Sequence, residues 1–121
     1  MNGDLTLSVF EVIGSRLAVA SDDGQKVFER ISGAMKEGKV VSVAFRNVQS
    51  ITSAFLNAAI GQLYGTFSED QIRSQLKVVD MQPDDLLLLK RVVDTAKEYF
   101  KDPDRFKSVT RQVLGADTDG E

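Results

Sequence analysis

A chain of 121 residues, 42% hydrophobic and 27% charged, has the size and composition of one small globular domain. It contains no cysteine and no histidine, which excludes disulfides, thiol nucleophiles, imidazole acid–base catalysis and the commonest zinc ligands. With 15 basic and 18 acidic residues, the formal net charge is -3, the wrong sign for a protein that binds the phosphate backbone of nucleic acids. We therefore expect a protein that is not an enzyme, holds no metal or cofactor and does not bind nucleic acid.

The sequence carries no signal for a membrane. No segment approaches the roughly 18 consecutive apolar residues of a membrane-spanning helix. The first residues, MNGDLT, lack the basic and then apolar layout of a signal peptide. We therefore expect a cytoplasmic protein without a membrane segment.

The first third of the chain predicts two strands and a helix. Residues 5–12 alternate between apolar and polar with one change of phase, which predicts a bulged or edge strand, and residues 16–20 add a short strand that returns as a hairpin. Residues 21–23 offer capping oxygens and negative charge for a helix that Gly38 ends. The apolar run 40–45 is typical of a buried central strand.

The middle of the chain predicts a polar turn and a helix. Residues 46–50 form the turn, after which Thr52 and Ser53 begin a largely apolar helix that closes at Gly65. A short helix over residues 68–75 and a strand over 76–81 follow.

The last long helix begins at Pro83, which the first helical turn tolerates, and carries an apolar stripe to about residue 100. The leucines at 86–89 are interpreted as core, with an exposed interaction face as the alternative, whereas Arg91 falls on the opposite, solvated side. Pro103 ends or interrupts this helix, and the apolar spacing within residues 106–114 indicates a segment that packs on this chain or on another.

We expect a single domain over residues 1–114 and a disordered tail over residues 115–121. The alternation of strands and helices implies right-handed crossovers, and hence an α/β fold with a parallel or mixed sheet of about four strands packed by three to four helices.

The turn before Ser53 is the most informative place for function. A strand that feeds through a polar turn into a helix start makes a ready anion site, and a phosphate on Ser53 would lie against free backbone N–H groups. The competing interpretation is that Ser53 or Thr52 only caps the helix. Arg46 is the nearest basic residue, and Asn57, one turn after Ser53, either bonds to the backbone or lines a partner surface.

Paired aspartates occur at two further places. Asp22 and Asp23, like Asp84 and Asp85, fall in the first turn of a predicted helix, where negative charge complements the helix dipole. We interpret both pairs as helix stabilisers and not as metal ligands.

The segment 41–65, VSVAFRNVQSITSAFLNAAIGQLYG, resembles the STAS-like domain family of unknown function, bacterial relatives of the anti-sigma-factor antagonists. The resemblance implies a small α/β sandwich and a regulatory, protein-binding role. In the antagonists a serine follows an aspartate at this turn, and a partner kinase phosphorylates it to break binding. Thr52 stands in place of the aspartate, Ser53 matches the serine, and Ala54 replaces a second serine.

Two functions from different classes remain. The first is a non-enzymatic protein-interaction module, with a kinase-like anti-sigma protein as partner and Ser53 as its phosphorylation site; Thr52 is a local alternative that the antagonist motif does not support. The surface would include Arg46 and Asn57. The alternative is a domain that binds a nucleotide or other small molecule, with the same helix start as its anion pocket.

Overall fold

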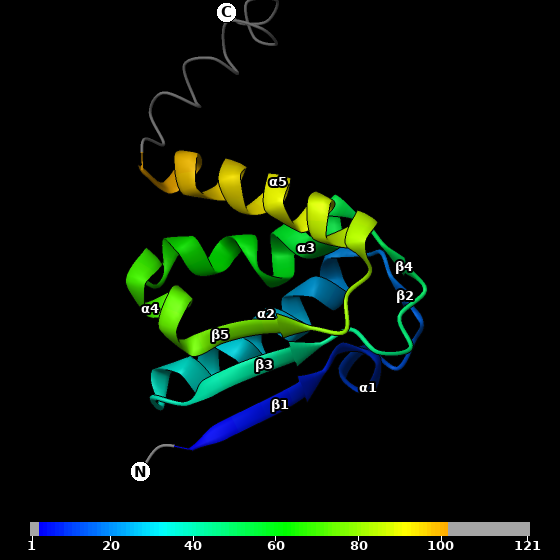
Figure 1. Ribbon diagram of the computed structural model, residues 1–121, viewed down its shortest axis with the longest axis horizontal. Helices are drawn as coiled ribbons and strands as arrows, with labels where there is room; N and C mark the ends of the chain where they lie inside the picture. Colours follow the sequence, from blue (N-terminus) through cyan, green and yellow to red (C-terminus); the bar gives the residue numbers. More distant parts are fainter. Residues whose placement is uncertain (1–2, 102–121) are drawn as a thin grey trace, which may run out of the picture.

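The computed structural model of the protein describes residues 3–101, and its centre is a parallel sheet (Figure 1). Strands β1 (Asp4–Ser8), β3 (Val40–Ala44) and β5 (Leu76–Val79) lie in the order β1-β3-β5 and all pair in parallel. A second, two-stranded parallel sheet joins β2 (Leu17–Ala18) to β4 (Ser50–Ile51). The predicted α/β class with a parallel sheet is confirmed.

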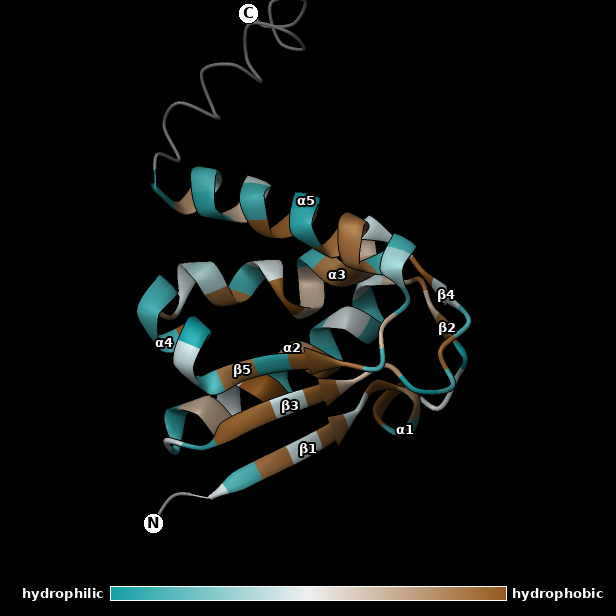
Figure 2. Ribbon diagram, in the orientation of Figure 1, coloured by the Kyte–Doolittle hydropathy of each residue, from teal (hydrophilic) through white to brown (hydrophobic). Residues whose placement is uncertain are grey.

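Alternation of side chains gives the main sheet one apolar and one polar face. Two rows across the strands are apolar and buried or half-buried: Leu5, Val41, Leu76 and Leu7, Val43, Val78. The row between them, Thr6, Ser42 and Lys77, points to the other face and is polar (Figure 2). The described helices therefore pack on one face of this sheet, and no described helix covers the other.

Three helices build the layer above that apolar face. Helix α2 (Ser21–Lys36) lies against α3 (Ser53–Ala59), which in turn lies against α5 (Pro83–Lys101) and continues into the 3-10 helix η1 (Gly61–Gly65). Buried positions on α2, α3 and the central strand form a single core, with Phe55, Ile31 and Leu56 as its largest enclosed side chains.

The two short helices flank the sheet. Helix α1 (Val9–Ile13) directly follows β1, and α4 (Glu69–Gln75) directly precedes β5. Helix α4 begins with a capping box between Ser68 and Gln71. Within residues 3–101, no helix combines the length and the apolarity that crossing a membrane requires.

The predicted strand over residues 5–12 is wrong in its second half. Ser8 ends β1 because its hydroxyl accepts a hydrogen bond from the Glu11 amide, 3.2 Å away, and so caps α1. Gly14, with φ 69°, closes that one-turn helix. The predicted hairpin is also wrong, because β2 pairs in parallel with β4 and not with β1.

Two predicted helix details also differ from the structure. Helix α2 starts at Ser21 as expected, but Ala20 is its N-cap residue and no side chain caps it, so only the predicted acidic first turn is confirmed. The apolar helix after Thr52 is interrupted at Ile60, and η1 follows. There the side-chain amide of Gln62 donates to the Ala58 carbonyl at 2.8 Å, replacing the backbone donor of a continued helix.

The start of α5 corrects another expectation. Leu86 and Leu87 are 45% and 62% exposed, so these two leucines are not core residues, although Leu88 and Leu89 are half-buried against the core. The segment 106–114, the tail 115–121 and Pro103 lie outside the described residues.

Candidate functional site

Thr52 is the residue that caps α3. Its Oγ1 accepts a hydrogen bond from the Phe55 amide at 3.2 Å and donates one to the Val19 carbonyl at 2.6 Å. The hydroxyl therefore joins the start of α3 to Val19, the residue that follows β2. The capping interpretation is confirmed for Thr52.

Ser53 is the first residue of α3 and is exposed. Its hydroxyl makes no hydrogen bond to any residue from 3 to 101. Of the two hydroxyls at this turn, Ser53 holds the one that is free to react or to bind.

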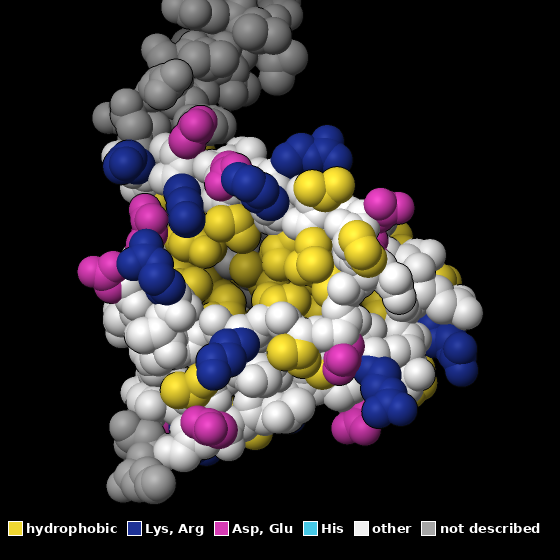
Figure 3. Space-filling model, in the orientation of Figure 1, with side chains coloured by type: hydrophobic (Ala, Val, Ile, Leu, Met, Phe, Trp, Pro, Cys, Tyr) yellow, Lys and Arg dark blue, Asp and Glu magenta, His cyan; other side chains and the backbone are white. Residues whose placement is uncertain are grey.

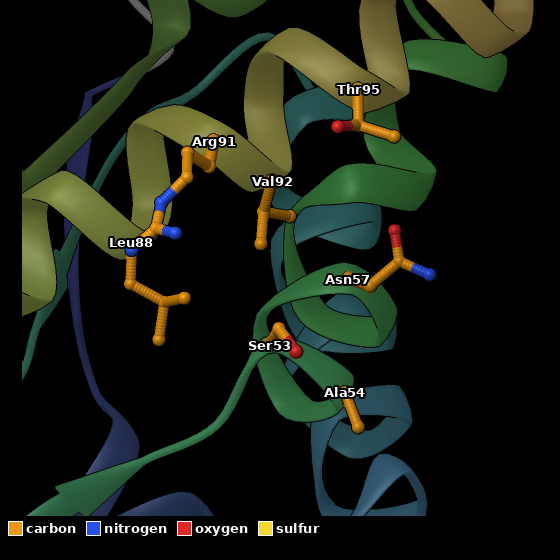
Figure 4. A pocket seen from close by; sticks show the side chains of 7 residues that line it. All are labelled: Ser53, Ala54, Asn57, Leu88, Arg91, Val92 and Thr95. Carbon is orange, nitrogen blue, oxygen red and sulfur yellow. The ribbon is translucent and has the colours of Figure 1, made fainter.

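A hollow of about 500 Å³ opens beside Ser53, between α3 and α5 (Figure 4). Helix α3 contributes Ser53, Ala54 and Asn57 to its wall, and α5 contributes Leu88, Arg91, Val92 and Thr95. The four positions of α5 share one helical face, because they are spaced by three and four residues. The Ser53 hydroxyl therefore faces a concave, mixed surface built from two helices.

Arg91 supplies the charge of this hollow. Its guanidinium forms no ion pair with a described residue, and no carboxylate is among the described residues that line the hollow. The sequence pattern places Arg91 on the solvated side of α5 and gives no signal for this role, since the partner helix lies more than 30 residues away along the chain. A cation therefore borders the space that the Ser53 hydroxyl faces.

Asn57 lies on the same wall as Ser53. Its side-chain amide makes no hydrogen bond to a described residue and packs over Gly61, where an added Cβ would lie 2.6 Å from Asn57 Oδ1. The interpretation that Asn57 bonds to the backbone is therefore wrong for the part of the chain that the structure describes. The residue is exposed and lines the hollow.

Arg46 is not brought to Ser53. It lines a separate hollow of about 420 Å³ at the carboxyl ends of β3 and β5, together with Asp80 and Asp85. Sequence proximity alone grouped Arg46 with the turn. The structure places Arg91, and not Arg46, on the Ser53 surface.

The aspartate pairs stand in helix first turns, as predicted. Asp22 and Asp23 begin α2, where Asp23 also pairs with Lys26 at 3.6 Å, and Asp84 and Asp85 begin α5. Over the described residues, no group of acidic side chains is arranged to hold a metal ion.

Because Thr52 caps α3 and Ser53 makes no hydrogen bond to a described residue, substitutions at these two neighbours should differ in their effect on stability. We expect Thr52→Val to lower the free energy of unfolding by about 1–2 kcal/mol, since it removes a helix cap. Thr52→Ser should keep most of that stability, and Ser53→Ala should change it by less than about 0.5 kcal/mol, as is usual for an exposed side chain. Urea unfolding of the three variants measures these values; equal losses in Thr52→Val and Ser53→Ala would contradict the assignment.

Comparison with known proteins supports the fold. The family described as STAS-like domain of unknown function (DUF4325) matches residues 23–86, more than half of the chain, and the match includes most of α2 and all of β3, the Ser53 turn and β5. Neither the curated proteins nor the solved structures include a significant match. The chain therefore belongs to the family of STAS-like domains of unknown function.

Proposed function

We propose that this protein is a non-enzymatic regulatory module that binds a protein partner through the surface around Ser53, and that phosphorylation of Ser53 releases the partner. The single observation that carries the proposal is the free, exposed Ser53 hydroxyl in a hollow between two helices. A kinase needs such a hydroxyl, whereas the neighbouring Thr52 hydroxyl already donates one hydrogen bond and accepts another.

The surroundings of Ser53 suit a protein interface. Leu87 is 62% exposed and lies one helical turn before Arg91, so an exposed apolar side chain is the neighbour, on α5, of the arginine that lines the hollow. Interfaces are enriched in arginine, and a large exposed apolar side chain gains stability when a partner covers it. We therefore propose that Leu87, Arg91 and Ser53 contact the partner.

The switch is electrostatic. Phosphorylation adds about -1.5 to -2 charges at Ser53. The new charge would attract Arg91 across the hollow and repel an acidic group of the partner, so the guanidinium is no longer available to that partner group. Membership in a STAS-like family supports a kinase-like anti-sigma protein as the partner, in the cytoplasm of a bacterium.

The described residues that line this hollow include no proton acceptor for catalysis. Its described lining residues include a serine, a threonine, an asparagine and an arginine, but no carboxylate, and the sequence holds no histidine or cysteine. An activated serine needs an adjacent base. The arrangement therefore favours binding over reaction.

The proposal predicts that Ser53→Glu weakens partner binding at least about tenfold, which corresponds to about 1.4 kcal/mol. Ser21→Glu is the matched control, because Ser21 is likewise the exposed first residue of a helix, α2, where glutamate has the same effect on the helix dipole. The partner is captured from the host cell with the unmodified protein, and its affinity for each variant is measured by calorimetry. Equal affinities for Ser53→Glu and Ser21→Glu, both folded, would refute the switch.

A second candidate function is the binding of a nucleotide or another small anion in the same hollow. Arg91 favours it, because it supplies a cation that the Ser53 turn itself lacks, and about 500 Å³ falls within the volume of small-molecule sites. Against it, α3 has only seven residues and its cap position is occupied by Thr52. A purified protein that retains a small anion, and loses it in Arg91→Met, would decide for this function.

A further inference from the structure

An apolar groove runs between β5 and α5 on the face shown in Figure 3, where hydrophobic side chains gather in a hollow bordered by charged ones. The groove measures about 300 Å³. Its apolar lining consists of Ile60, Ile72, Leu76, Val78, Leu89 and Val93. Most of these side chains also touch the core, so the groove is a part of the core that the described residues leave open.

The groove follows the free edge of the main sheet. Strand β5 is the last strand in the order β1-β3-β5, and among the described residues no strand pairs with its outer side. Exposed apolar sheet edges are usually covered, because they invite pairing with other chains. Leu76, Val78, Leu89 and Val93 are only half-buried, so an occupant would cover apolar side chains from both walls.

The chain itself continues next to this groove. Helix α5, which carries Leu89, Val93 and Lys97 along one wall, ends its described part at Lys101, and residues 102–121 follow. Pro103 disfavours a straight continuation of the helix, because proline removes a backbone donor and restricts the residue before it. The described part of α5 ends at Lys101, about one helical turn after Lys97 of the groove.

Residues 105–114 match the groove in pattern and length. Their apolar side chains, Phe106, Val109, Val113 and Leu114, recur at the spacing of one amphipathic face. Ten residues span about 15 Å as a helix and about 33 Å as a strand, whereas Leu89 to Lys97 on α5 covers about 12 Å. The segment is long enough to cover the groove in either conformation.

The charged side chains at the border of the groove already have partners. Arg73 pairs with Asp70 at 2.9 Å, and Lys97 pairs with Glu69 at 3.7 Å. The segment itself carries only basic charges, at Arg105, Lys107 and Arg111. The apolar side chains, and not the charges, therefore favour this pairing.

From these observations we infer that the groove between β5 and α5 binds residues 105–114 of the same chain, through the apolar side chains of that segment. The bound segment covers the free edge of β5 and the half-buried side chains of Leu76, Val78, Leu89 and Val93. This inference is independent of Ser53, whose hollow lies on other residues of α3 and α5.

The test uses the full-length chain, which is free of cysteine and therefore accepts defined pairs of engineered cysteines. Arg73→Cys with Val109→Cys places one thiol at the groove and one on the segment, at positions 36 residues apart in the chain, whereas Thr6→Cys with Val109→Cys places the first thiol on the other face of the sheet. With a short bis-maleimide, we expect an internal crosslink in the first protein and none in the second. Crosslinked dimers would overturn the inference in favour of a second copy, and equal crosslinking of both pairs would overturn it outright.

A second measurement does not depend on crosslinking. The variant Phe106→Glu/Val109→Glu should increase the binding of a hydrophobic dye severalfold and speed amide exchange over Leu76–Val79, since it expels the segment from the groove. Ser108→Glu/Gln112→Glu adds the same charge on the polar side of the segment and should change neither value. Unchanged exchange in the first variant would contradict the inference and would leave the Ser53 proposal untouched.

Discussion

Phe55→Ala is expected to lower the free energy of unfolding by about 3–5 kcal/mol, the usual cost of deleting a buried phenylalanine. Phe55 is 0% exposed and is the largest fully enclosed side chain of the core. Its removal loses the transfer free energy of the ring and leaves a cavity between α3 and its neighbours. The same residue donates its amide to Thr52 Oγ1, so the packing under α3 also holds the turn that presents Ser53.

Phe28→Ala is the matched control for this prediction. Phe28 lies on α2 and is only half-buried at the margin of the same core, so the same deletion should cost clearly less. Urea unfolding followed by circular dichroism gives both values, with equal slopes showing that the unfolded states are comparable. A loss for Phe55→Ala no greater than that for Phe28→Ala would show that α3 is not the centre of the core.

The elements that the sequence predicts correctly carry their signals locally. The apolar periodicity of α2 and α5, the Gly38 stop and the apolar run of β3 each lie within one element. The helix start at Thr52 and Ser53 belongs to the same class, because a capping residue and a following apolar helix are neighbours in sequence. Local rules therefore suffice for the scaffold and for the position of the candidate serine.

The features that the sequence misses depend on contacts between distant segments. Strands β2 and β4 have two residues each, too few for any periodicity, and their pairing joins positions 33 residues apart. Gln75 donates its side-chain amide to the carbonyls of Met35 and Lys39, at 3.1 and 3.0 Å, across 40 and 36 residues. No pattern within one element reveals such bonds.

The composition of the candidate site shows the same division. Ser53 could be found from its own turn, whereas Arg91 joins it only because α5 packs beside α3. Leu86 and Leu87 belong to the run of leucines that the sequence pattern assigns to the core, yet they remain exposed, and Leu87 shares a helical face with Lys90 and Arg91. The charge and the apolar contacts of the Ser53 surface are thus properties of helix packing.

That packing depends on Gly24, and Gly24→Ala is expected to lower the free energy of unfolding by about 1–3 kcal/mol, the usual cost of inserting a methyl group into a filled core. A Cβ at this position of α2 would lie 2.5 Å from the Phe55 carbonyl oxygen and 2.8 Å from the Ala58 Cβ on α3. One of these neighbours is backbone, so the overlap is relieved only if α3 moves away from α2.

Gly33→Ala on the same helix tests whether the close approach, and not the loss of glycine, causes that effect. Gly33 is exposed and an added Cβ would meet no atom within 4 Å, so alanine should raise the free energy of unfolding by up to about 1 kcal/mol through its higher helix propensity. The melting temperature and the urea midpoint should therefore both fall for Gly24→Ala and both rise for Gly33→Ala. If Gly24→Ala is stabilising as well, α3 does not rest on α2 at this distance, and the hollow beside Ser53 has a different shape. If Gly24→Ala is destabilising and Gly33→Ala is stabilising, Gly24→Ala moves α3 while it keeps the Ser53 hydroxyl. Its affinity for the partner, measured below its melting temperature, then shows how far binding depends on the position of α3 alone.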